Sequence, residues 1–362
     1  MGNQGLKLRE SIIENARALG FSRVTFTRAE RVDPGRLLGW LRSGYQGRMQ
    51  SLERNLEKRL DPGLILPEVK TVAVFPWPYS GGGDLPYSDA GKGIVSKYAR
   101  GRDYHKLITK RLRRLVREIG REFPGLNAKA YVDTGPVLEK YWAERSGLGW
   151  IGKHTNLIDR RCGSWFFLGV LFLDREVPPD SEARNYCGSC RRCIDVCPTS
   201  AIVEPYVMDS RKCISYLTIE LREDIPVRLR KPMGDLIFGC DLCQDVCPWN
   251  TRYCSEKETG IPVDDLVFDL KKLAFLSEDR FDEFFQGRAI RRTRWRGLMR
   301  NVAIAMGNSG RSDFVSSLEH LLNCPDPMVR RHAAWGLREI GSDPTRHDGG
   351  PSDPGSSAGA RG

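Results

Sequence analysis

The chain has 362 residues, and its 57 lysines and arginines exceed its 46 aspartates and glutamates. This length predicts two or three domains rather than one. No run of residues is long and apolar enough to span a membrane, and the start lacks the pattern of an export signal, so we expect a cytoplasmic protein with no membrane partner. In a reducing cytoplasm the 11 cysteines are expected to be metal ligands, catalytic groups or buried side chains, not disulfides.

The first half of the chain predicts an α/β domain. Apolar residues recur at helical spacing in two segments, and three short apolar runs are typical of buried strands. The helices are expected over residues 6–20, ending at Gly20, and 106–119; the strands are expected over residues 70–75, 128–133 and 165–173. This alternation over roughly the first 175 residues favours an α/β domain. The glycine-rich segment 81–91 is expected to be a loop, either bordering a site or simply at the surface.

The second half predicts two further units. A proline-rich linker leads into a cysteine-dense segment, and the pattern then becomes helical. Residues 300–307 and 329–341 form a weak repeat of an arginine, small residues and a terminal glycine, which resembles paired HEAT-like helices. The dipeptide at 326–327, Asp-Pro, predicts a helix start. The expected limits are 1–178 for the α/β domain, 179–258 for the cysteine-rich domain, 259–342 for the helical domain and 343–362 for a disordered tail.

Eight of the cysteines form two groups with iron–sulfur spacing. Residues 187–198 follow C-x2-C-x2-C-x3-C-P, and residues 240–248 repeat the ending C-x2-C-x3-C-P. In two-cluster ferredoxins this spacing places three thiolates on one [4Fe-4S] cluster and sends the fourth to the other. The expected ligands are Cys187, Cys190, Cys193 and Cys247 for one cluster and Cys197, Cys213, Cys240 and Cys243 for the other. Structural zinc is the alternative, but the dense first run suits its tetrahedral sites poorly. The spare cysteines, Cys162, Cys254 and Cys324, are expected to be small buried residues.

Two clusters form a one-electron relay, so the reaction site must lie elsewhere. The segment 147–152 reads G-x-G-x-x-G, but it follows a helical segment, whereas a dinucleotide site requires a preceding strand. Asp103 and His105 begin the cobalamin motif D-x-H-x-x-G, but Ile108 replaces its glycine. We therefore expect His105 to be a structural or polar-contact histidine, not a cobalt ligand. Asp133 ends a predicted strand, where it either faces a crevice or caps the next helix.

Seven segments taken together resemble the epoxyqueuosine reductase family. They are Tyr98–His105, Val132–Pro136, Ala143–Lys153, Gly163–Phe166, Cys187–Pro198, Cys213–Glu220 and Gly239–Asn250. The resemblance runs from about residue 6 to residue 341, and only the tail lies outside it. It implies an α+β multidomain enzyme of queuosine biosynthesis that reduces epoxyqueuosine to queuosine at the wobble position of tRNA. It also implies two [4Fe-4S] clusters in a ferredoxin-like domain and a base-off cobalamin, without a histidine ligand, between that domain and the α/β domain.

The resemblance assigns roles to further residues. Reducing the epoxide consumes two electrons, one from each cluster, and Asp133 matches the family's proton donor. Because an ordinary aspartate is ionised at pH 7, this role would require burial beside the corrin to raise the pKa of Asp133. The residues implied to contact the cobalamin are Arg59, Tyr98, Asp133, Lys153, His154, Asn156, Ser164, Ser215 and Asp241. A low-potential electron donor is implied but not identified, and no coiled coil or apolar helix argues against a monomer.

Residues 288–300 contain six arginines and no acidic residue. They are Arg288, Arg291, Arg292, Arg294, Arg296 and Arg300. A solvated helix face is the usual explanation of such a run, but the net charge of +11 and the implied tRNA substrate favour phosphate binding. Trp295 lies among them and either stacks on a base or packs in the core.

Two rival functions compete with the family assignment. A reductive dehalogenase-like enzyme would also combine cobalamin with two clusters, but it would lack the arginine-rich helices. A non-catalytic electron-transfer or scaffold protein would use the clusters and helices without a cobalamin. A corrinoid absorption band in the purified protein would argue against the scaffold alternative.

Overall fold

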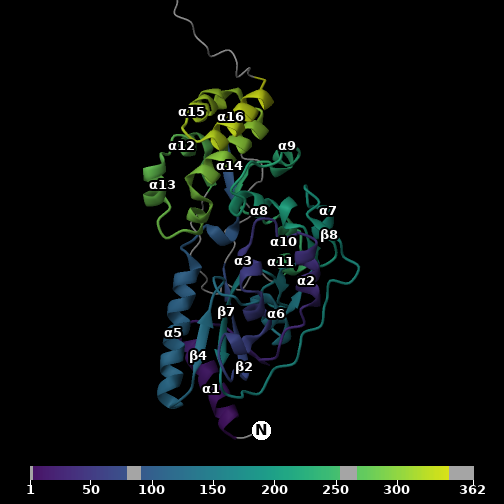
Figure 1. Cartoon of the computed structure of the whole chain (residues 1–362), viewed down its shortest axis with the longest axis vertical. Coiled ribbons are helices and arrows are strands. Elements are labelled where there is room, and N and C mark those ends of the chain that lie inside the picture. Colours follow the sequence, from purple (N-terminus) through teal and green to yellow (C-terminus); the bar gives the residue numbers. More distant parts are fainter. Residues whose placement is uncertain (1–2, 80–90, 253–266, 342–362) are drawn as a thin grey trace, which may run out of the picture.

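The computed structural model describes residues 3–79, 91–252 and 267–341. The predictions for residues 81–90, Cys254 and the tail at 343–362 lie outside the described residues. The main sheet and its helices occupy one end of the elongated molecule, and the C-terminal helices occupy the other (Figure 1). None of the helices in the described ranges combines the length and apolar character that a membrane span requires.

A four-stranded sheet in the order β1-β2-β7-β4 organises the first part of the chain. Its strands are β1 (Thr25–Arg28), β2 (Thr71–Pro78), β4 (Ala128–Tyr131) and β7 (Phe166–Leu173). All neighbouring strands in it are antiparallel, which differs from the parallel sheet that an α/β pattern usually builds. Alternation along a sequence does not fix strand direction, because direction depends on the end of the sheet to which each connection returns.

Both faces of this sheet are buried. Side chains alternate along β2, so that Phe75 faces the layer of α1 (Asn3–Ala18) and α5 (Tyr104–Glu122), whereas Val74 faces α6 (Glu139–Arg145). Figure 1 shows α1 and α5 on one side of the strands and α6 on the other. The two expected helices are confirmed, although α1 ends at Ala18, just before Gly20 in a left-handed conformation. The smaller elements of this region are α2 (Gly35–Arg42), α3 (Ser51–Arg54), α4 (Leu56–Leu60), β5 (Trp150–Ile151) and β6 (Leu157–Ile158).

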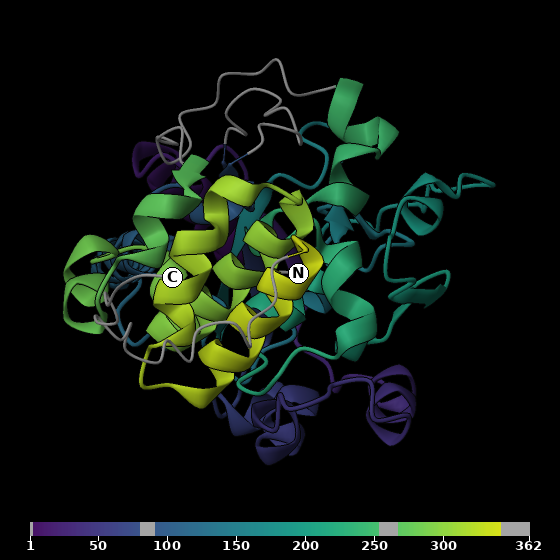
Figure 2. The same ribbon diagram turned by 90° about the horizontal axis from the view of Figure 1, so that it is seen from above.

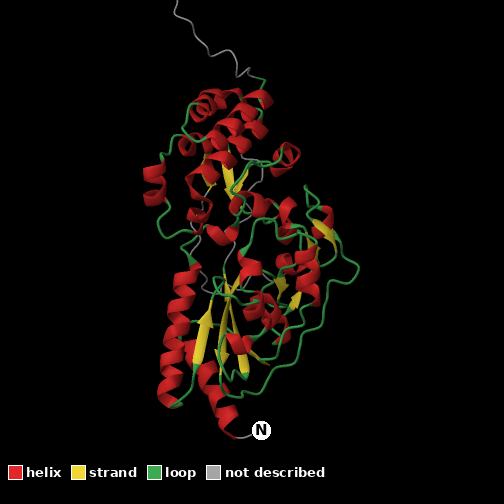
Figure 3. Cartoon of the chain, viewed as in Figure 1, coloured by secondary structure: helices red, strands yellow, loops and turns green. Residues whose placement is uncertain are grey.

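The cysteine-rich segment consists of short elements joined by loops (Figure 3). They are α7 (Arg192–Asp195), the hairpin of β8 (Ile202–Glu204) and β9 (Val207–Met208), α8 (Ile214–Ile219), α9 (Val227–Arg230), α10 (Leu242–Asp245) and α11 (Pro248–Arg252). Two of these helices each begin between the cysteines of a C-x2-C-x3-C ending, so the motifs fold as tight helical turns.

A second sheet joins all three parts of the chain. Strand β3 (Lys92–Val95) lies between β10 (Leu236–Phe238), which is parallel to it, and β11 (Val267–Asp269), which is antiparallel. The three strands come from the three segments that the sequence analysis separates. The segments are therefore interleaved here.

The C-terminal region is helical, as expected (Figure 2). It contains α12 (Leu270–Ala274), α13 (Glu278–Phe284), the 3₁₀ turn η5 (Ala289–Thr293), α14 (Arg294–Ser309), α15 (Val315–Leu322) and α16 (Pro327–Glu339). The predicted helix start is confirmed, since Asp326 accepts hydrogen bonds from the first amides of α16. Gly307 does not end α14, contrary to the expected repeat. A Cβ on Gly307 would lie 2.7 Å from the Cα of Gly336, so this glycine lets α14 and α16 cross closely.

Candidate active site

Asp133 lies in the turn after β4 with a left-handed backbone, at φ 54°. Few residues other than glycine adopt this conformation, although aspartate tolerates it better than most. Its carboxylate is 2.9 Å from Nε2 of His105 and 3.3 Å from both the Tyr104 hydroxyl and the Arg292 guanidinium. Asp133 does not cap a helix, because α6 begins after Leu138 without a side-chain cap. The strained turn therefore presents this carboxylate to a cation, an imidazole and a phenol.

His105 lies between two carboxylates. Its Nδ1 is 2.6 Å from Asp103, which also caps the start of α5 by accepting the His105 backbone amide at 3.0 Å. The imidazole stacks on the ring of Tyr104, which in turn stacks on Phe167. The prediction of a polar-contact histidine is confirmed, and both ring nitrogens are occupied.

The charges of this group differ from the expectation. Burial alone would raise the pKa of Asp133, but the hydrogen bond from His105 and the charge of Arg292 outweigh it and hold the pKa at about 2. Burial would lower the pKa of His105, but its hydrogen bonds to Asp103 and Asp133 raise it to about 9. The protein groups around Asp133, whose side chain is 43% exposed, therefore lower its pKa, and the upward shift expected from burial beside a corrin stays a prediction. At pH 7 the proton is carried by His105.

Three further polar groups surround the same space. Burial and the negative charge of Asp133 raise the pKa of Glu139 to about 7. Lys140 donates a hydrogen bond of 2.8 Å to Asn156. Burial lowers the pKa of Lys140, while nearby Asp133 and the thiol of Cys243 oppose that shift. The acid–base groups therefore adjoin one of the cysteine sets.

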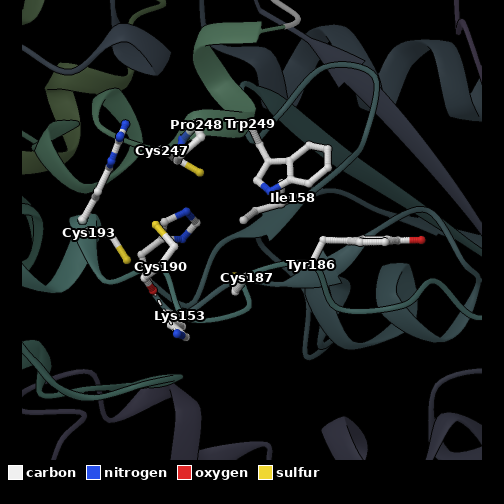
Figure 4. Close-up of a pocket in the computed structure, with 11 residues that line it drawn as sticks. Lys153, Ile158, Tyr186, Cys187, Cys190, Cys193, Cys247, Pro248 and Trp249 are labelled. Carbon is white, nitrogen blue, oxygen red and sulfur yellow. Dashed lines mark hydrogen bonds between the residues drawn. The ribbon is translucent and has the colours of Figure 1, made fainter.

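The first predicted cysteine set lines a cavity of about 220 Å³. The sulfur atoms of Cys190, Cys193 and Cys247 face the space between them (Figure 4). Cys190 is exposed, so this cavity lies near the surface. The loop around it is held by Lys153, which donates hydrogen bonds to the carbonyls of Gly188 and Cys190.

The thiols divide in space into the two predicted sets. Burial and three neighbouring thiols raise the pKa of Cys193 to about 11; these neighbours are Cys187, Cys190 and Cys247. Burial, with Cys213 and Cys197 nearby, raises the pKa of Cys240 to about 12. Within the described part of the chain, no three ligand-type side chains are arranged to hold a single metal ion.

The predicted cobalamin contacts divide between two places. Arg59, whose guanidinium reaches the carbonyl of Gly135, and Tyr98 and Asn156 lie near Asp133. The remaining residues lie near the cysteines and are engaged with protein groups. Besides Lys153, these are His154, whose Nδ1 accepts the Asn156 amide; Ser164, bonded to Gln244 and Asn250; Asp241, bonded to Ser96 and Lys97; and Ser215, bonded to the thiol of Cys213.

The arginine run does not form one continuous surface. Arg300 is fully buried and donates to the carbonyls of Leu217, Leu221 and Glu223, so the prediction that it contacts tRNA is wrong. Its guanidinium satisfies backbone groups at the end of α8. Trp295 packs against the helical core and donates to the Leu276 carbonyl, so it does not stack on a base.

The other arginines lie nearer the surface. Arg291, Arg292 and Arg296 pair with Asp282, Asp133 and Asp326, respectively. Arg294 is exposed, and the partly buried Arg288 donates to the carbonyl of Arg100.

The fold and the site define a protein that carries two separate groups of cysteines and, near one of them, a group of acid–base side chains. A family model described as 4Fe-4S double cluster binding domain matches residues 186–250, and one described as Epoxyqueuosine reductase QueG, DUF1730 matches residues 59–134. The chain is thus an iron–sulfur protein, which excludes the zinc alternative. The chain belongs to the epoxyqueuosine reductase family, whose members are oxidoreductases. This membership also decides against the dehalogenase and scaffold alternatives.

Relatives cover nearly the whole chain. The epoxyqueuosine reductase of Xanthomonas campestris is 40% identical over 334 residues, covering 90% of this chain and 94% of the relative. That of Escherichia coli is 38% identical over 341 residues, covering 92% and 89%. A solved epoxyqueuosine reductase with an epoxyqueuosine-modified tRNA-Tyr stem loop has a TM-score of 0.85 at 29% identity, covering 93% and 91%. The Bacillus subtilis structure, with an aspartate catalytic loop swung out of its active site, has a TM-score of 0.85 at 27% identity, covering 92% and 90%.

Sequence reasoning missed several groups at the site. Glu139 and Lys140 lie in a segment that it used only as evidence for a helix. His105 was expected to make polar contacts, but its partners were not identified, although the helix-capping pattern of Asp103 was visible beside it. The contact between Arg292 and Asp133 spans 159 positions and has no local signal.

Proposed function

We propose that this chain reduces the epoxide of epoxyqueuosine in tRNA to the alkene of queuosine. The reaction takes up two electrons and two protons and releases the oxygen as water. The observation that carries the proposal is that the Asp133 carboxylate, which is bonded to the imidazole of His105, and the thiol of Cys243 both influence the pKa of Lys140. A proton source and an electron source therefore adjoin one site.

The two cysteine sets would form an electron relay. We assign one [4Fe-4S] cluster to each predicted set, as the double-cluster match and the grouping of the thiols support. The set with exposed Cys190 would receive electrons from an external low-potential donor. The set containing Cys243 adjoins Lys140 and would pass them to the site. Each cluster carries one electron at a time, which matches a two-electron reduction in steps.

We propose that a base-off cobalamin lies between Asp133 and the inner set of cysteines, which is the set that contains Cys243. The Nε of Arg59 and one oxygen of Glu139 are buried and have no hydrogen-bond partner among the described residues. A corrin with amide side chains supplies the acceptor and the donor that these atoms lack. When bound, cobalamin would supply a cobalt centre that delivers electrons to the substrate. Both ring nitrogens of His105 face carboxylates, which agrees with the absence of a histidine ligand from this side of the site.

Arg59, Tyr98 and Asn156 are the predicted contacts best placed to line the cobalamin. Ser215, beside Cys213, would border it on the inner-cluster side. Lys153, Ser164 and Asp241 would support the cluster loops instead, because protein groups already occupy their polar atoms. His154 accepts the Asn156 amide at Nδ1, but its buried Nε2 has no hydrogen-bond partner among the described residues, so this ring can still contact the cofactor.

The helical segment would hold the tRNA. We propose that its HEAT-like helices present Arg288, Arg291, Arg294 and Arg296 to phosphates beside the site, while the modified base enters next to Asp133. A solved relative with a modified tRNA stem loop supports this assignment. The domain limits predicted from the sequence remain proposals, although the sheet around β3 takes one strand from each of the three predicted domains. We also retain a cytoplasmic monomer as the expected state.

One experiment tests the proposed function. The protein, purified anaerobically with both clusters and cobalamin, is given a chemical reductant and tRNA that contains epoxyqueuosine, and the nucleosides are separated after digestion. We expect each protein molecule to form queuosine over repeated turnovers, with one queuosine for each epoxyqueuosine consumed. A sample with full iron content and a corrinoid absorption band that forms no queuosine would overturn the function.

The same assay tests Asp133. Asp133→Asn should retain the clusters and the corrinoid band but lose turnover by about 10² to 10⁴, the usual contribution of a general acid. Asp313→Asn, at an exposed ion pair of the helical segment, serves as the control. Turnover of Asp133→Asn near that of the wild type would remove Asp133 from the role.

A further inference from the structure

We propose that His105 is the proton source of this site, and that Asp133 passes its proton to the departing epoxide oxygen when substrate fills the site. His105 would be a positioning residue that acts through Asp133. The inference rests on the proposed function and deepens it.

The geometry forms a line of three groups. Asp103 lies 2.6 Å from Nδ1 of His105, and Nε2 of His105 lies 2.9 Å from Asp133. The pKa values of Asp103 and Asp133 are both lowered, so both acids are ionised at pH 7; because a carboxylate only accepts hydrogen bonds, both ring nitrogens must then carry a proton. The imidazole is therefore a cation whose Nε2 proton points at Asp133.

The ring is held in this orientation from several sides. Asp103 bonds both the backbone amide and Nδ1 of His105, and so fixes the ring relative to the start of α5. Tyr104 stacks against the imidazole with ring centroids 4.0 Å apart, and Phe167 stacks against Tyr104 at 3.7 Å. The relay is therefore built into α5 and β7, and only Asp133 belongs to a turn.

The charged groups around the pair determine where its proton resides. Arg292 from η5 and the Tyr104 hydroxyl face Asp133, while Glu139 and Lys140 from α6 lie on its other side. Lys106 adds a positive charge near Asp103. Before substrate binds, these charged neighbours favour an ion pair, with an imidazolium at His105 and a carboxylate at Asp133.

Filling the site would reverse this preference. Burial raises the pKa of Asp133 and lowers that of His105, and it is the largest single influence on each. The Asp133 side chain is still 43% exposed, so a bound substrate has water left to displace. A charged pair that loses water is destabilised relative to the neutral pair formed by proton transfer. Binding would therefore move the proton from Nε2 to the Asp133 carboxylate.

The proposed proton transfer conserves atoms and electrons. The His105 proton reaches Asp133 and then the epoxide oxygen, as the carbon–oxygen bond breaks and its electron pair remains on oxygen. Two electrons from the clusters and a second proton complete the release of water and the alkene. His105 is left neutral and regains its proton from solvent before the next turnover.

Histidine NMR tests the resting state. The chain has five histidines, so ¹⁵N-histidine labelling gives few signals to assign. In the protein with oxidised clusters and no substrate, we expect the His105 signal to titrate near pH 9, and to titrate at lower pH in Asp103→Asn and Asp133→Asn. Exposed His320 in α15 serves as an internal reference. A His105 ring that is neutral at pH 7 would overturn the proposal.

Turnover tests the transfer. His105→Gln can still donate a hydrogen bond to Asp133 but carries no transferable proton. We expect turnover at saturating tRNA to fall at least about 100-fold, with tRNA affinity and the corrinoid band unchanged. The wild-type kcat/KM, which reports the substrate-free enzyme, should decline above about pH 9, and this decline should be absent from His105→Gln. A merely structural role would lower the rate equally at every pH.

Two controls separate the possible failures. His320→Gln should behave as the wild type. If wild-type protein forms queuosine and His105→Gln does so within threefold, with the same pH profile, the relay is wrong while the proposed function stands. If the wild type forms no queuosine, the proposed function itself fails, and the NMR titration still decides the charge of His105.

Discussion

Arg292 and Asp133 form an ion pair of 3.3 Å that ties the helical segment to the turn after β4. The same guanidinium lies 3.3 Å from Glu220. An arginine that bridges two carboxylates is not free to neutralise a phosphate, so it differs in function from its neighbours in the run. The arginine-rich segment therefore combines one residue that contacts Asp133 with others that we propose to face the tRNA.

Arg292→Gln should affect the maximal rate, whereas Arg294→Gln should affect the salt dependence of tRNA binding. Loss of the charge-assisted hydrogen bond at Asp133 should make Arg292→Gln about tenfold slower at saturating tRNA, with an unchanged salt dependence of binding. Arg294→Gln should keep its maximal rate but reduce the slope of log affinity against log salt by about 0.7 to 0.9, one phosphate contact. Filter binding at several salt concentrations and the queuosine assay give both quantities, and a reversed pattern would contradict the division.

Arg300 should affect stability rather than binding. Arg300→Met leaves two buried carbonyls and a partly buried one without their donor, and each buried unsatisfied group costs about 1 to 3 kcal/mol. We expect the variant to lose at least about 2 kcal/mol and to melt several degrees lower in a thermal scan of the cluster-loaded protein. The exposed Arg294→Met is the matched control. Equal melting temperatures would show that the buried guanidinium contributes nothing.

Cysteine substitutions should remove the clusters separately. Cys190→Ser should cost the outer cluster and Cys240→Ser the inner one, each lowering iron from about eight to about four atoms per chain. Cys162→Ser and Cys324→Ser should retain the full iron content. Iron analysis and electron paramagnetic resonance of the reduced protein give the result. Loss of iron in either control would mean that the ligand sets are assigned wrongly.

Glu139 should make stability depend on pH. Burial and the charge of Asp133 raise the pKa of Glu139 from 4.5 to about 7. Between pH 4.5 and pH 7 the folded protein therefore keeps a proton on Glu139 that the unfolded chain has released. Stability therefore falls as pH rises through this window. In cobalamin-free protein, Glu139→Gln should raise the melting temperature at pH 8 but not at pH 4.5. Glu14→Gln, on the exposed face of α1, should change neither, and an equal gain at both pH values would refute the titration.

Local features were predictable from the sequence, and long-range features were not. The helix expected at 106–119 appears as Tyr104–Glu122, because its apolar spacing sets one buried face. The cysteine groups were predictable because the geometry of an iron–sulfur cluster fixes the spacing of ligands that lie a few residues apart. The burial of Arg300 was hidden, because its acceptors are carbonyls that lie about 80 positions away.

The catalytic charges could not be read from residue types alone. The expectation that burial raises the pKa of Asp133 identified a real influence but omitted the two cations that oppose it. One of those cations, Arg292, comes from the helical segment, and the other, His105, was expected to make polar contacts without a partner being identified. A pKa depends on the sum of burial and neighbouring charge, and the second part requires the three-dimensional contacts.

The sheet around β3 constrains the order in which this protein is made. During synthesis, β3 emerges about 140 residues before β10 and about 170 before β11, so its two edges stay unpaired while those residues are made. All eight proposed cluster cysteines lie between β3 and β11 in the sequence. Every cluster ligand has therefore been synthesised before this sheet can close, which leaves a period when iron and sulfide can reach the nascent cysteines.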